Sequence, residues 1–228
     1  MVSRQTLKPA GVVIVDGSTE SSQRWSSWPN AIYLHRPNIV LGASRNLALS
    51  TAVLSGAENV AIWDDDDYYT EWHLERAQQL LTADPQIMAV GSSLTPVYFP
   101  DYDEIWLSGP FIDTHSLEPA LVCRASLINS HAFDSTDRKG LGSVFLKGYT
   151  VPLRQMNGSH ILVSHTMNTV SKEAIRHGSC LGRRSYDAIP DILKDHPSVK
   201  RGSGDGTRAD SALRHRPRLD EIGRLVPA

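Results

Sequence analysis

Four consecutive aspartates occupy positions 64–67, directly after the apolar run at residues 59–63. Adjacent like charges repel one another, and a hard cation such as Mg²⁺ or Mn²⁺ relieves that repulsion because it prefers carboxylate oxygens. In an extended segment alternate side chains point to the same side, so we expect Asp64 and Asp66 to face a common ligand. The ligand spacing of a calcium-binding EF-hand is absent. The alternative is a solvated acidic turn, whose charge the N-terminus of a following helix would favour.

A further aspartate, Asp16, follows the apolar run at residues 11–15. Short apolar runs that stop at loops are typical of buried strands, and apolar residues at helical spacing indicate helices. The predicted strands are residues 11–15, 31–34, 59–63 and 87–90, and the predicted helices are residues 44–54 and 71–81, with Thr70 as the N-cap of the second. This order predicts an α/β fold with a mostly parallel central sheet, in which ligands bind at the carboxyl ends of the strands. Both acidic segments fall at such ends.

The second half of the chain has a weaker pattern. Residues 95–119 are rich in aromatic residues, proline and glycine, which indicates loops or hairpins, while residues 121–128 and 144–151 fit either a strand or a helix. We expect one domain over residues 1–195 and a polar, mobile tail over residues 196–228.

The composition excludes several classes of protein. The 228 residues carry 23 lysines and arginines against 25 aspartates and glutamates, a net charge of −2 that argues against a dedicated nucleic-acid or membrane-surface binder. No apolar run is long enough for a transmembrane segment, and the N-terminus has no signal-peptide core. Two cysteines are too few for a disulfide scaffold. These features predict a soluble, cytoplasmic protein.

Three segments carry a resemblance to a known family: VVIVDGSTESS at residues 12–22, GASRNLALSTA at 42–52 and VAIWDDDDYYTEWHLERAQQLL at 60–81. In sequence, order and spacing they resemble family 2 glycosyltransferases of the GT-A fold. The resemblance is strong over about a third of the chain. It implies transfer of a sugar from a nucleotide-sugar donor to an acceptor, with inversion at the sugar. The acceptor is unidentified: a glycan, a lipid-linked molecule, a small molecule or a protein.

The resemblance also implies roles for individual residues. Asp16 would contact the base of the donor, and Arg45 would help to hold its nucleotide. Asp64 and Asp66 resemble the family's DXD pair, which would hold Mn²⁺ or Mg²⁺ on the donor diphosphate, with Asp65 between them on the substrate side. The alternatives are that Asp16 forms an ordinary turn and that Arg45 simply pairs with the acidic cluster.

The chain departs from the family at two places. Residues 3–9 resemble the end of the family's first helix, so the first strand is expected to be lacking, through a misplaced start codon or a truncated form, and an edge strand would be left unpaired. In addition, Leu141 and Gly142 stand where the family carries the acidic pair that includes the catalytic base. Asp134 and Asp137 lie near that segment and are candidate bases, with loop capping as the alternative.

His165, in the segment VSHTMNT, resembles a late histidine that completes the metal shell in some relatives; a half-buried structural histidine is the alternative. The other histidines, including His160, show no ligand spacing. Aromatic residues in the expected acceptor region would stack on sugar rings or, as we favour, pack the loops: Tyr98, Phe99, Tyr102 and Trp106.

Two rival functions follow from these departures. One is a non-catalytic relative that binds a nucleotide, a sugar or a protein partner. The other is a nucleotidyltransferase that makes the activated sugar, although the glycine-rich basic loop typical of that class is absent from the sequence.

Overall fold

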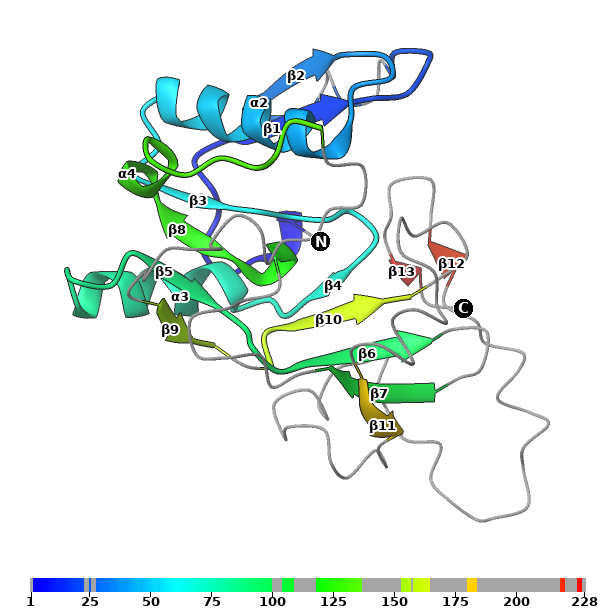
Figure 1. Ribbon diagram of the computed structural model, residues 1–228, viewed down its shortest axis with the longest axis vertical. Coiled ribbons are helices and arrows are strands. Elements are labelled where there is room, and N and C mark those ends of the chain that lie inside the picture. Colours follow the sequence, from blue (N-terminus) through cyan, green and yellow to red (C-terminus); the bar gives the residue numbers. More distant parts are fainter. Residues whose placement is uncertain are drawn as a thin grey trace.

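The computed structural model describes residues 2–22, 25, 28–99, 104–108, 118–136, 153–156, 158–164, 180–183, 218–219 and 225–226 (Figure 1). Helices and mixed sheets alternate along this part of the chain, which confirms the predicted α/β class. Two 3₁₀ helices, η1 and η2, cover Val2–Arg4 and Glu118–Ala120. Among the described helices, none has the length and apolar character needed to cross a membrane.

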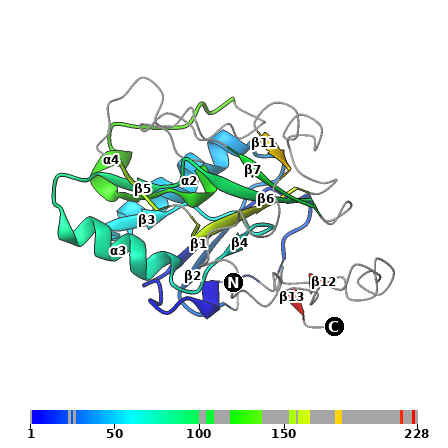
Figure 2. The ribbon, with the colours of Figure 1, turned by 90° about the horizontal axis from the view of Figure 1, so that it is seen from below.

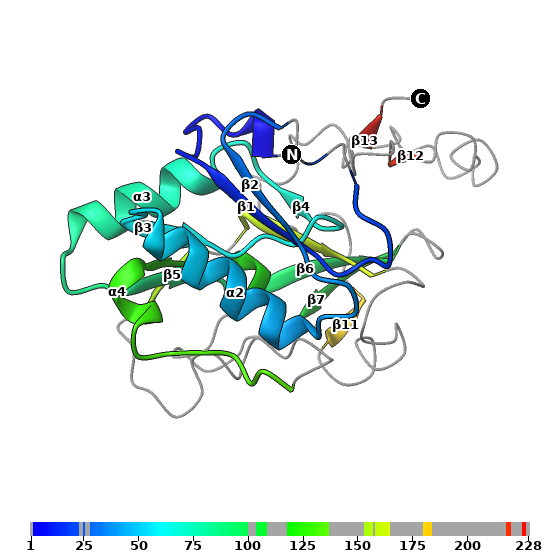
Figure 3. The same cartoon turned by 90° about the horizontal axis from the view of Figure 1, so that it is seen from above.

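The first layer consists of a parallel strand pair with one helix against it. Strands β1 (Val12–Asp16) and β2 (Ala31–His35) pair in parallel with Val12 opposite Ala31, close to the predicted bounds. Helix α2 (Leu41–Leu54) begins three residues earlier than predicted and packs against both β1 and β3 (Figure 3). Because Asp16 is the last residue of β1, the strand ends directly at the candidate donor-binding residue.

The second layer is a four-stranded sheet with the order β3, β8, β5, β9, whose bounds are Asn59–Ala61, Val122–Arg124, Ala89–Gly91 and Leu153–Gln155. Strand β8 pairs antiparallel with both β3 and β5, whereas β5 and β9 are parallel. The expectation of a mostly parallel sheet is therefore wrong here, because β8 comes between two strands that were expected to be neighbours. Residues 121–128 supply both this strand and the short helix α4 (Ala125–Ile128).

Helix α3 (His73–Ala83) covers this sheet against β5 and β8 (Figure 2). It starts two residues later than predicted, and Thr70 is not its N-cap, since the Thr70 hydroxyl donates to the Ser159 carbonyl. The buried side chain of Gln5 caps the helix start instead. Its amide nitrogen donates to the Thr70 carbonyl, and its amide oxygen accepts a hydrogen bond from the Leu74 N–H. A residue far away in the sequence thus satisfies one of the free N–H groups at the helix start.

The third layer is a five-stranded sheet with the order β11, β7, β6, β10, β4, whose bounds are Cys180–Arg183, Glu104–Ser108, Thr95–Phe99, His160–Val163 and Tyr68–Tyr69. Strands β6 and β7 form an antiparallel hairpin, as expected for residues 95–119. Strand β10 lies between β6 and β4, so it joins the second half of the chain to the segment that follows the aspartates. The short antiparallel pair β12 (Arg218–Leu219) and β13 (Leu225–Val226) falls in the predicted tail.

Strands β1 and β3 belong to separate sheets. Within the described ranges each of them pairs along one edge only, β1 with β2 and β3 with β8. Whether the chain lacks the family's first strand stays a prediction. All four aliphatic residues of β1, Val12, Val13, Ile14 and Val15, are only half-buried.

Candidate metal centre

The four aspartates form the turn between β3 and β4, and their side chains differ in exposure. Asp64 and Asp66 are partly exposed, Asp65 is exposed and Asp67 is buried. Carboxylate oxygens of Asp64, Asp66 and Asp67 all lie within 4.8 Å of one another. The prediction that Asp64 and Asp66 come together is confirmed, and Asp67 joins them. Asp65 is not part of this group, and its contact with a substrate stays a prediction.

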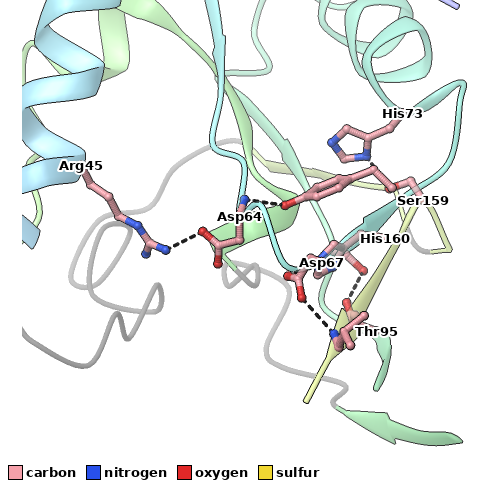
Figure 4. A network of polar contacts seen from close by, with 10 residues as sticks. Arg45, Asp64, Asp67, His73, Thr95, Ser159 and His160 are labelled. Atoms are coloured by element: carbon pink, nitrogen blue, oxygen red, sulfur yellow. Dashed lines mark hydrogen bonds and ion pairs between the residues drawn. The ribbon is translucent and has the colours of Figure 1, made fainter. Parts of the chain in front are cut away.

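Asp64 is paired with Arg45, which extends from α2 toward the turn (Figure 4). The Arg45 Nη2 lies 2.9 Å from Asp64 Oδ1, and the two side chains are 12% and 30% exposed. Burial raises the pKa of Asp64, Arg45 acts against that rise, and the charge of Asp67 adds to it. The Arg45 guanidinium also lies over the Phe133 ring, 5.7 Å from its centroid. The structure therefore realises the alternative in which Arg45 pairs with the cluster, and its contact with a nucleotide stays a prediction.

The backbone of the turn is anchored by Tyr69. The hydroxyl oxygen of Tyr69 accepts a hydrogen bond of 2.9 Å from the Asp64 N–H, and its ring stacks on Trp63 with centroids 3.7 Å apart. Burial, together with the negative charge of the nearby aspartates, raises the pKa of Tyr69 well above its ordinary value. Tyr69 is therefore a neutral phenol at any physiological pH.

Asp67 is fixed from the opposite side by β10. Its Oδ2 lies 2.7 Å from His160 Nε2, and its Oδ1 accepts a 2.9 Å hydrogen bond from the Val163 N–H. The side chains of Asp67 and His160 are 1% and 0% exposed, so the pair is out of contact with solvent. Neither residue was singled out in the sequence, because His160 lies 93 positions from Asp67 and no local pattern links them.

A second buried histidine lies behind the turn. His73 Nδ1 is 3.0 Å from the Ser159 hydroxyl, and its ring meets the rings of Trp63 and Tyr69 edge-on. Burial lowers the pKa of His73 to about 3, and the neighbouring His160 adds to that effect. His73 is therefore neutral and serves as packing beneath the aromatic residues that hold the turn.

Asp16 is satisfied by its own loop. Its Oδ1 accepts hydrogen bonds from the Ser18 N–H at 2.9 Å and the Ser18 hydroxyl at 2.5 Å, and its Oδ2 accepts one of 2.5 Å from the Tyr33 hydroxyl. Burial on its own would raise the pKa of Asp16, but these hydrogen bonds outweigh it and lower the pKa. The loop thus has the contacts of an ordinary aspartate turn, and recognition of a base by Asp16 stays a prediction.

Of the two candidate bases, the structure describes only Asp134, an exposed residue. Hydrogen bonds from the hydroxyl and N–H of Thr136 to its Oδ1 lower the pKa of Asp134, which makes it a poor proton acceptor and matches the loop-capping alternative. The preceding residue, Phe133, is held to α2 by Asn46, whose side chain exchanges two 2.8 Å hydrogen bonds with the Phe133 backbone. Asp137 and His165 lie outside the described residues.

The expected acceptor aromatics support the packing alternative. Phe99 is fully buried, Trp106 packs edge-on against it with centroids 6.2 Å apart, and the Trp106 indole N–H donates to Glu104. Tyr98 is partly buried in the same strand as Phe99, and Tyr102 is outside the described ranges.

The donor set of the turn fits a hard divalent cation. Asp64 and Asp66 offer carboxylate oxygens near one another and are partly open to solvent, which is the ligand chemistry of Mg²⁺ and Mn²⁺ rather than of a thiolate-preferring metal. Comparison of the chain with protein-family models and with curated proteins finds no match to either. The argument for function therefore rests on the geometry of the turn and on the resemblance of its sequence.

Proposed function

We propose that this protein is a metal-dependent glycosyltransferase of the GT-A type, which moves a sugar from a nucleotide-sugar donor to an acceptor. The observation that carries the proposal is the convergence of the Asp64 and Asp66 carboxylates on a turn at the end of β3. The negative charge of Asp64 is offset in part by Arg45, with which it forms an ion pair. A divalent cation would complete that compensation.

In this function Asp64 and Asp66 would hold a Mn²⁺ or Mg²⁺ ion at the site of the donor diphosphate. Such an ion would supply positive charge to offset the charge of the departing nucleoside diphosphate. Arg45, already directed at Asp64, lies where its guanidinium would meet the same diphosphate. Asp16 and Asp65 remain the proposed donor contacts, His165 the proposed third ligand, and Asp137 the proposed base, since the lowered pKa of Asp134 weakens the case for that residue.

A second function, a non-catalytic nucleotide- or sugar-binding protein, is favoured by one specific observation. Asp134 is the candidate base that the structure describes, and its carboxylate is already bonded to Thr136. A protein that binds the donor through the acidic turn but carries no base would bind without turnover. The two functions share the metal site and differ only in transfer.

Calorimetric titration with UDP, and then with GDP, in the presence and absence of Mn²⁺ tests the shared part. We expect binding that requires Mn²⁺, is lost in Asp66→Ala and is retained in Asp65→Asn, the matched control that removes a charge from the same turn without removing a proposed ligand. Nucleotide binding that is the same with and without Mn²⁺, or that is retained in Asp66→Ala, would overturn the proposed metal site. Slow hydrolysis of a UDP- or GDP-sugar by the wild-type protein would then favour the transferase over the binding protein.

A further inference from the structure

We propose that Asp67 is a positioning residue rather than a metal ligand: with His160 it fixes the acidic turn so that Asp64 and Asp66 are held at the separation a divalent cation needs. This inference rests on the proposed metal site. It assigns different roles to three carboxylates that all lie within 4.8 Å of one another.

The contacts of Asp67 distinguish it from the other two residues. One oxygen faces His160 Nε2 and the other faces the Val163 N–H, and the side chain is 1% exposed. Ligation by either oxygen would weaken a hydrogen bond inside the protein, and an unsatisfied buried donor is costly. Asp64 and Asp66 are partly open to solvent, so they can accept a cation from water without exposing buried groups.

The environment of His160 favours the tautomer in which Nε2 donates a hydrogen bond to Asp67. Its Nδ1 is buried and meets no hydrogen-bond partner among the residues that the structure describes, so the tautomer with its proton on Nε2 leaves no donor unpaired there. The ring is packed at a tilt against Tyr69, with centroids 4.9 Å apart. Its direction is therefore set by packing as well as by the hydrogen bond to Asp67.

The strand behind the pair gives it a rigid support. Strand β4 consists of Tyr68 and Tyr69 alone, and its ladder to β10 joins just two residue pairs, Tyr69 with His160 and Tyr68 with Ile161. On its other edge β10 pairs with β6 in the middle of the five-stranded sheet. The bonds from Asp67 to His160 and Val163 extend the attachment of β4 beyond its short ladder (Figure 4).

The consequence falls on Asp66, the next residue in the chain. If the hydrogen bond between His160 and Asp67 is lost, the backbone that orients Asp66 becomes less constrained, although the proposed ligands Asp64 and Asp66 are both still present. Metal affinity then falls without the loss of any ligand, which is how residues behind a metal site act when they orient its ligands.

The experiment compares Mn²⁺ affinity, measured by electron paramagnetic resonance, in the wild type, His160→Phe and His160→Gln. Phenylalanine keeps the ring and removes the donor, whereas glutamine places an amide N–H near the position of Nε2. His73→Phe is the matched control, since it alters an equally buried histidine whose hydrogen bond goes to Ser159 and not to an aspartate of the turn.

We expect affinity to fall by about tenfold or more in His160→Phe, to recover toward the wild-type value in His160→Gln, and to stay at the wild-type value in His73→Phe. Wild-type or tighter affinity in His160→Phe would overturn the proposal, since a ligating Asp67 gains freedom when its competitor is removed. Equal losses in His160→Phe and His73→Phe would also overturn it, because general destabilisation would explain both. If His160→Phe fails to fold, His160→Asn takes its place: its shorter side chain puts an amide near the position of Nδ1 and cannot reach Asp67. A positioning residue predicts a loss of affinity there, whereas a ligating Asp67 predicts none.

A wild-type protein that binds no Mn²⁺ would refute the proposed function. The anchoring of the turn by Asp67 and His160 would then be tested by a second measurement. Amide hydrogen exchange across residues 64–67, without metal, should be faster in His160→Phe than in the wild type. Unchanged exchange there would overturn the anchoring itself.

Discussion

Two acidic segments end neighbouring layers of this protein, and they are stabilised in opposite ways. The carboxylate of Asp16 takes its hydrogen bonds from Ser18, two residues away, and from Tyr33 on the adjoining strand. The turn at residues 64–67 takes its contacts from elements far away in the sequence: Arg45 on α2, and His160 and Val163 on β10.

The difference shows at which acidic segment a bound cation would stabilise the carboxylates more. At Asp16 three local donors stabilise one negative charge, so nothing further is needed. At the turn, three carboxylates lie within 4.8 Å of one another, and burial together with the charge of Asp67 raises the pKa of Asp64. An external cation therefore gains more free energy at the turn than at Asp16.

The largest expected effect of this contrast is on stability. Asp67→Ala leaves the buried His160 donor and the Val163 N–H without their acceptor, and we expect a loss of about 3 kcal/mol in the free energy of unfolding. Asp16→Ala breaks hydrogen bonds within a turn that water can reach, and we expect about 1 kcal/mol. Urea titrations of both variants measure the two losses. Losses of equal size would show that the two segments are not anchored differently.

A second comparison uses two arginines. Arg124 donates to the carbonyls of Ile87 and Leu81 and lies 3.5 Å from that of Asp84, around the end of α3, so Arg124→Met should cost about 2 kcal/mol of stability and leave Mn²⁺ affinity unchanged. Arg45→Met removes a cation that competes for Asp64, so Mn²⁺ alone should bind about fivefold tighter. Calorimetry with Mn²⁺ and urea titration together test both variants. Weaker Mn²⁺ binding in Arg45→Met would mean that Arg45 orients Asp64 rather than competing for it.

The two segments also differ in the pH range where they respond. The pKa of His73 is about 3 in the folded protein against an ordinary value of 6.5. As the pH falls from 6.5 toward 3, His73 therefore binds a proton in the unfolded chain but stays neutral in the folded protein. The free energy of unfolding should therefore fall by about 2 kcal/mol between neutral pH and about pH 5. His73→Phe should remove that part of the dependence, as measured by thermal unfolding at both pH values.

Asp16 has its pKa lowered, so its contribution is present above its ordinary value of 3.8 and is lost only as the pH falls below that value. Asp16→Asn should thus leave the slope between neutral pH and about pH 5 unchanged. The same slope in wild type and His73→Phe would contradict the assignment to the buried histidine.

The smallest expected effect concerns Asp134. Within the described part of the chain, its exposed carboxylate is bonded to Thr136 of its own turn. Asp134→Asn should therefore leave both Mn²⁺ affinity and UDP or GDP binding at their wild-type values. A clear change in nucleotide binding would mean that this turn is part of the donor site, and loss of transfer alone would restore Asp134 as the base.

The sequence predicts those parts of the fold that are set by short-range pattern. The apolar runs of β1 and β2 and the periodicity of α2 and α3 place these elements within a few residues of their observed bounds. The sequence also predicts that Asp64 and Asp66 come together, but the reason differs: the segment is a turn and not the extended strand on which the prediction rests.

The rest depends on contacts between distant residues. The start of α3 is set by Gln5, and the insertion of β8 between β3 and β5 is a matter of strand order, which no single run of residues encodes. The pairing of Asp67 with His160 is of the same kind. A usable signal was that Asp67 directly precedes the buried Tyr68 and Tyr69, so that its side chain had to find a partner inside the protein.

Whether a divalent cation binds at the acidic turn and not at the Asp16 loop can be decided by counting bound Mn²⁺ by electron paramagnetic resonance in the wild type, Asp66→Asn and Asp16→Asn. We expect a site in the wild type that is retained in Asp16→Asn and weakened by about tenfold or more in Asp66→Asn. Manganese that stays free in the wild-type protein, or equal weakening in the two variants, would contradict it.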